Sequence, residues 1–119
     1  MDLLDLHGRL GMALALYFAA LGVWGIGLGA LGSGPSPAFR GAIVVVEIAV
    51  AAQGIPGLLL WLRGLSMQGV HALYGFALLV TMPMAASIVR EGSPRRTSLA
   101  LGVAALFAAG LCVRGLTTA

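Results

Sequence analysis

The sequence has no lysine, one cysteine and few charges of either sign. Only 9% of its 119 residues are charged, whereas soluble domains carry about 25%. All of its basic residues are arginines, and they do not alternate with aromatic side chains, so the net charge of +3 does not describe a nucleic-acid-binding surface. The single cysteine, Cys112, excludes an intrachain disulfide and a metal site built on several cysteines. We expect no nucleic-acid partner.

Apolar residues make up 60% of the sequence, and the mean hydropathy is +1.02. They form four stretches that are each long enough to cross a bilayer core, which takes roughly 20 residues. The predicted helices cover about residues 10–31, 40–62, 69–89 and 97–116 of one domain, residues 1–119. Connections such as residues 32–39 and 63–68 are short, so consecutive helices should be antiparallel. The predicted fold is all-α, an integral membrane four-helix up-down transmembrane bundle.

Glycine and proline add detail to these helices. Gly25 and Gly29 form a GxxxG pair, which allows another helix backbone to approach closely in lipid. Pro56 and Pro83 lie inside the second and third helices, where proline removes a backbone donor and tends to kink the helix.

Because consecutive helices run in opposite directions, each basic residue can be assigned to one of the two ends of the bundle. The end that holds the N-terminus carries three arginines and both histidines: His7, Arg9, Arg63, His71 and Arg114. The other end carries Arg40, Arg90, Arg95 and Arg96. The positive-inside rule therefore places the second end in the cytoplasm and both termini outside it. We expect an inner or plasma membrane of a prokaryote.

Two histidines head helices that should lie diagonally across the core. His7 precedes the first helix and His71 begins the third, and each is followed four residues later by a glycine, Gly11 and Gly75. Two imidazoles can ligate the iron of a b-type haem, and a glycine one turn away leaves room for the ring. Four side chains near this end could bind haem propionates or donate a hydrogen bond nearby: Arg9, Arg63, Arg114 and Tyr74.

Other interpretations of the histidines stay open. His71 alone could ligate a chlorin pigment, or both histidines could be solvated or bonded to loop carbonyls. His7 lies about three residues outside Leu10, and His71 lies one or two residues inside its helix. The resulting offset of roughly 6 Å must be absorbed by tilt or by an extended start.

The second helix carries two polar side chains in an apolar run. Glu47 is costly in lipid, and it could relay protons, contact a quinone head group or hydrogen-bond a neighbouring helix. Gln53 is predicted to bond the backbone that Pro56 leaves without a donor.

These observations predict a small subunit that binds haem and passes electrons within a respiratory or photosynthetic complex, with a quinone or a redox protein as partner. In architecture alone it resembles the four-helix membrane cytochromes b. The alternative is a cofactor-free accessory subunit whose glycine faces pack against other integral membrane subunits or further copies of itself. A transporter built around Glu47 is a third hypothesis. No nucleophile–base pair or paired carboxylates are evident, so we expect no catalysis by this chain alone.

Overall fold

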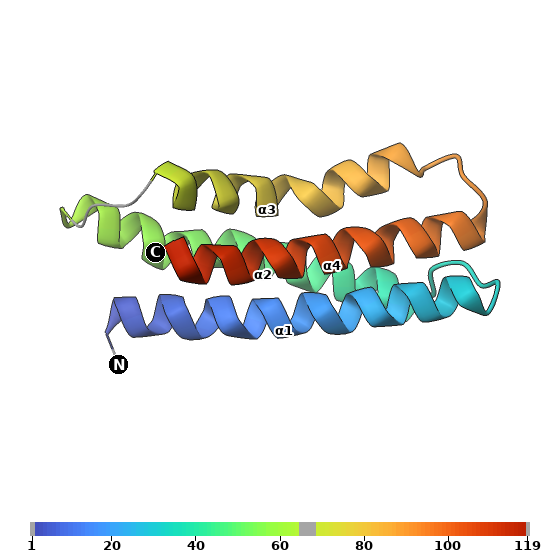
Figure 1. The fold of residues 1–119 in the computed structure, drawn as a ribbon, viewed down its shortest axis with the longest axis horizontal. Coiled ribbons are helices and arrows are strands. Elements are labelled where there is room, and N and C mark those ends of the chain that lie inside the picture. Colours follow the sequence, from blue (N-terminus) through green and yellow to red (C-terminus); the bar gives the residue numbers. More distant parts are fainter. Residues whose placement is uncertain (1, 65–68, 119) are drawn as a thin grey trace.

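The computed structural model describes residues 2–64 and 69–118, and these form four antiparallel helices (Figure 1). The helices are α1 (Leu3–Ala30), α2 (Pro37–Leu62), α3 (Gly69–Ile88) and α4 (Pro94–Thr118). Each is long and apolar enough to cross a membrane. Both termini lie at one end of the bundle, as predicted (Figure 1). The four-helix membrane fold is confirmed, although residues 65–68 of the predicted 63–68 connection lie outside the described chain.

Three helices begin earlier than predicted because capping residues precede them. The Asp2 carboxylate accepts a hydrogen bond of 2.8 Å from the Asp5 N–H, so α1 begins at its third residue rather than near residue 10. Ser36 caps α2 by accepting from the Phe39 N–H, and Ser93 caps α4 in the same way. A proline follows each of these serines at the first helical position, where its missing N–H costs nothing. The predicted starts near residues 10, 40 and 97 are therefore corrected to Leu3, Pro37 and Pro94.

The helices pack as a square in which α1 and α3 are diagonal. The most extensive packing joins α1 to α4, followed by α3 to α4 and α1 to α2, whereas α2 and α3 contact each other least. Within the described residues, neither diagonal pair makes a close backbone approach. The diagonal placement of the two histidine-bearing helices is therefore confirmed.

Glycines bring α1 and α4 into backbone contact. A Cβ built on Gly25 would lie 2.8 Å from the Gly102 Cα atom, and one on Gly102 would lie 2.6 Å from the Ile26 nitrogen. Two more glycines of α1 lie about one turn before and one turn after Gly25. Gly22 leaves room for Leu106 of α4, and Gly29 leaves room for Leu99. The predicted close approach at Gly25 and Gly29 is thus confirmed, and the partner is a helix of the same chain.

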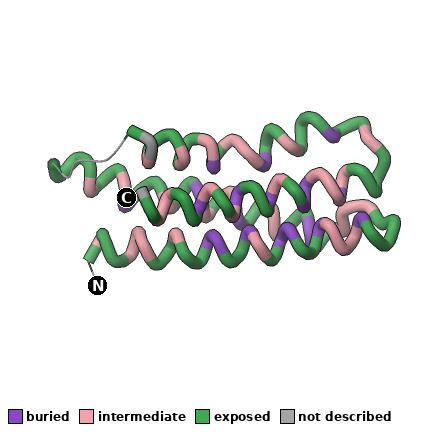
Figure 2. The backbone as a smooth tube through the Cα atoms, viewed as in Figure 1, coloured by how far each residue is buried: buried purple, intermediate pink, exposed green. Residues whose placement is uncertain are grey.

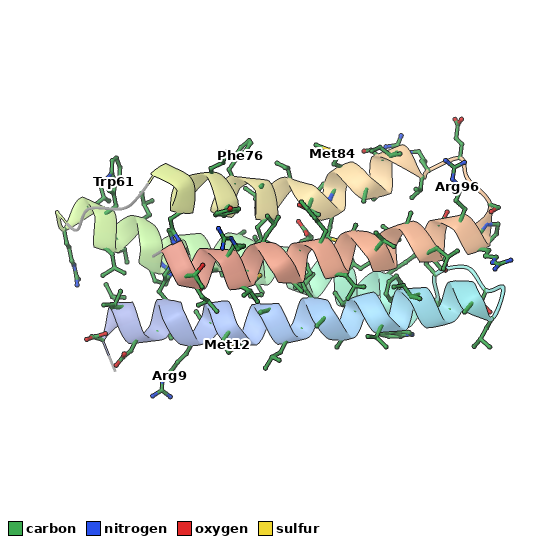
Figure 3. The ribbon with its side chains drawn as sticks, in the orientation of Figure 1. Arg9, Met12, Trp61, Phe76, Met84 and Arg96 are labelled. Atoms are coloured by element: carbon green, nitrogen blue, oxygen red, sulfur yellow. The ribbon has the colours of Figure 1, made fainter. Side chains whose placement is uncertain are left out.

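Burial is concentrated on α1 and α4 (Figure 2). In the most apolar 18-residue window of each, 33% of the residues are buried, against 6% in α3. Phe18, Phe39 and Met82 are the largest of the fully buried side chains. The outer faces are also apolar, and Figure 3 shows Phe76 and Met84 pointing away from the neighbouring helices. A helix that is apolar on all sides fits lipid, not water.

Neither proline ends its helix. Pro56 lies inside α2 and Pro83 inside α3, and both helices continue beyond them. The predicted kinks stay predictions.

We predict that Gly102→Ala lowers the free energy of unfolding by about 1–3 kcal/mol, because the added methyl group would overlap the α1 backbone. Denaturation of the detergent-solubilised protein with increasing SDS measures this loss. Gly110→Ala is the matched control, since no atom lies within 4 Å of a Cβ at that position of the same helix. Equal stabilities of the two variants would contradict the packing role of Gly102.

Candidate cofactor site

The two histidine rings meet at the end of the bundle that holds the termini. The centroids of the His7 and His71 rings are 6.0 Å apart, and the rings meet edge to face at 67°. His7 lies in the second turn of α1 and His71 at the third residue of α3, so both are helical and lie at one level. The predicted offset between the depths of the two histidines is therefore not observed. It is absent because α1 begins early and includes His7. Figure 1 shows these helices on opposite sides of α4.

His71 is held by α4. Its Nδ1 atom lies 3.0 Å from the carbonyl oxygen of Gly115. Because a carbonyl oxygen only accepts, Nδ1 is the donor of this hydrogen bond, which leaves Nε2 as the other ring nitrogen. A backbone carbonyl that fixes the tautomer in this way is common behind ligating histidines.

His7 is held against α2 without a hydrogen bond to its Nδ1 atom. A Cβ at Gly57 would lie 3.1 Å from the His7 Cε1 atom, so the ring edge packs directly on the α2 backbone. Nδ1 is buried and has no partner among the described residues. Buried polar atoms are usually satisfied, and an orphaned ring nitrogen calls for an explanation such as a missing ligand.

Gln53 of α2 also contacts this part of α1. Its Nε2 atom donates a hydrogen bond of 2.7 Å to the His7 carbonyl oxygen. The prediction that Gln53 bonds backbone freed by Pro56 is therefore wrong, because the extended α1 places a carbonyl within closer reach. Its Oε1 atom is buried and has no partner in the described chain.

A cavity of about 280 Å³ surrounds the two rings and is lined by all four helices. Four of its lining residues are glycines: Gly8, Gly11, Gly75 and Gly115. Nothing lies within 4 Å of a Cβ at Gly75, whereas a Cβ at Gly11 would lie 3.1 Å from the Leu116 side chain. Leucines and Cys112 supply most of the remaining wall. The site is thus apolar apart from its imidazoles, Gln53 and Tyr74.

The other predicted site residues divide into two groups. Gly11, Gly75 and Tyr74 line the cavity with the histidines. Arg9, Arg63 and Arg114 lie at the same end but do not line it, and Figure 3 shows Arg9 pointing away from the bundle. Their pairing with propionates stays a prediction.

Glu47 does not line the cavity either. It is half-buried, its Oε1 atom has no partner, and no hydrogen bond joins its carboxyl to another described residue. The interhelical hydrogen bond expected of it is therefore not seen in this part of the chain.

Sequence reasoning missed Gly57 and Gly115, although one signal was present. Gln53 and Gly57 repeat the four-residue spacing of His7 with Gly11 and of His71 with Gly75. Each pair places a polar side chain next to a glycine, which has no side chain, on the same face of the helix. Gly115 carries no comparable signal, because its contribution is a backbone carbonyl.

The separation of the two ring centroids is close to that of two imidazoles bound to one ion. Two metal–nitrogen bonds of about 2 Å and a further ~1 Å from each nitrogen to its ring centre give a separation of roughly 6 Å. Among the described residues no three His, Cys, Asp or Glu side chains come together, and a site made of protein ligands alone takes at least three. The described chain therefore brings two imidazoles, and no third side chain of these types, to this point of the bundle.

Comparison of the chain with protein-family models, curated proteins and solved structures found no match.

We predict that Gln53→Leu lowers the free energy of unfolding by about 0.6–1.7 kcal/mol, the range for interhelical hydrogen bonds in membranes. The loss reflects the bond to the His7 carbonyl. SDS denaturation measures it against Ala52→Leu, a change at an exposed position of the same helix. If the two variants unfold alike, the Gln53 bond contributes no stability.

Proposed function

We propose that the chain is a small membrane subunit that binds a b-type haem between His7 and His71 and passes electrons at the membrane face near its termini. The observation that supports this most is the 6.0 Å separation of two histidine rings from diagonal helices inside a glycine-lined cavity. The partner would be a redox protein or a quinone that reaches this face.

The residues of the chain would have distinct roles in holding the group. His7 and His71 would hold the group, and the Gly115 carbonyl would orient the His71 ring through its Nδ1–H. Gly57 would set the position of the His7 ring, because its missing side chain is where that ring packs. When bound, haem supplies one-electron transfer at a potential set by its ligands and surroundings.

Room for the macrocycle has to extend beyond the 280 Å³ cavity. Open space beside Gly75 provides part of it. The rest would have to come from a separation of α2 and α3, the neighbouring helices that pack least against each other. The apolar wall around the histidines would keep water from the ligands and so favour low-spin ligation by two nitrogens.

Absorption spectra of the detergent-purified protein, oxidised and then reduced with dithionite, test this proposal. We expect a Soret band and visible bands that sharpen on reduction. His7→Ala and His71→Ala should each abolish the low-spin spectrum because one axial ligand is lost.

A glycine pair on α2 provides a matched control. Gly57→Leu should displace the His7 ring and reduce haem content, whereas Gly54→Leu, at a position with nothing within 4 Å, should leave it unchanged. A colourless protein that stays colourless after haem addition would overturn the proposal and favour the cofactor-free accessory subunit. A red chlorin-like band that depends on His71 alone would favour a pigment protein.

A further inference from the structure

A long apolar groove runs along the outer side of α3 and α4, on the bundle half away from the histidines. Its volume is about 890 Å³, and its wall is almost entirely apolar, with Ala100, Val103 and Phe107 on α4 and Met84 and Ile88 on α3. The groove faces outward, and its lining side chains from Val103 and Met84 are more than half exposed. In a membrane protein this surface is in contact with lipid.

One end of the groove is basic. Arg95 and Arg96 line it beside the α3–α4 connection, together with Ser93. Figure 3 shows Arg96 at that end of the bundle. Among the described residues, neither guanidinium takes part in a hydrogen bond or an ion pair with another side chain. Two arginines therefore remain available for an anion at the membrane surface.

The length of the groove matches one leaflet. From Arg96 to Phe107 the helix rises through eleven residues, or about 16 Å at 1.5 Å per residue. Half of a bilayer's hydrocarbon core is about 15 Å thick. The groove thus begins at the interface and ends near the bilayer midplane, as an acyl chain does.

The charge around this end fits an anionic occupant. This end of the bundle carries four arginines, Arg40, Arg90, Arg95 and Arg96, and one acid, Glu91. Basic pockets between transmembrane helices are known to bind the head groups of anionic lipids. Arginine suits phosphate because its planar guanidinium donates two parallel hydrogen bonds.

We infer that the α3–α4 groove binds an anionic phospholipid, with its phosphate at Arg95 and Arg96 and an acyl chain along Ala100, Val103 and Phe107. The site is separate from the histidine cavity, which shares none of these residues. The inference holds whether or not the chain binds haem.

Native mass spectrometry of the detergent-solubilised protein tests the inference, with phosphatidylglycerol and phosphatidylcholine of identical acyl chains as probes. We expect the wild type to retain phosphatidylglycerol in preference to phosphatidylcholine. The double variant Arg95→Gln/Arg96→Gln should reduce this preference roughly tenfold or more, because two charges near the head group are removed.

Two further variants distinguish the effect of the arginine charges on lipid binding from the effect of the groove's shape. Arg9→Gln/Arg63→Gln removes two arginines from the opposite end and should keep the preference. Ala100→Phe fills the groove while its arginines remain and should weaken the binding of both lipids. Excess inorganic phosphate should not displace bound phosphatidylglycerol, since it lacks the acyl chain.

Three outcomes would overturn the inference. The first is a wild type without a preference for the anionic lipid. The second is an equal loss of lipid preference in the two double arginine variants, which would indicate that the net charge of the protein alone attracts the anionic lipid. The third is a delipidated dimer that Ala100→Phe dissociates, which would assign the groove to a second copy of the chain.

Discussion

The backbone contact between α1 and α4 sets the spacing of the whole bundle. Lipid gives no hydrophobic drive for helices to associate, so their adhesion depends on close packing and a few hydrogen bonds. Gly25 and Gly102 allow that packing because neither has a side chain to hold the helices apart. With α1 and α4 fixed to each other, the carbonyl of Gly115 on α4 lies in place for His71, and α3 is attached mainly through α4.

The histidine cavity follows from this unequal packing. Three of the four neighbouring pairs are well packed, while α2 and α3 touch least. The rings of His7 and His71 meet in the centre at one end, and Gln53 ties the start of α1 to α2 through the His7 carbonyl. The cavity is therefore bounded by three well-packed helix pairs and by one pair, α2 and α3, that packs weakly.

The fold was largely predictable from composition, whereas the site was predictable only in part. Helix number, antiparallel order and the diagonal placement of the histidines follow from four apolar stretches joined by short connections. The start of α1 was missed because the Asp2 cap was not recognised in the sequence. That error displaced His7 from its helix and gave Gln53 a partner it does not have. The Gly115 carbonyl could not be foreseen, since every residue carries a carbonyl and only tertiary packing selects one.

The dependence of α1 on α4 also has a consequence for how the chain assembles during synthesis. Of the four helices, α1 is made before its main partner α4, and Gly25 and Gly102 lie 77 residues apart in the sequence (102 − 25). Until α4 enters the membrane, the glycine face of α1 can only contact lipid or some other helix. The bundle therefore closes late, and a chain truncated before α4 would leave that face available to foreign transmembrane segments.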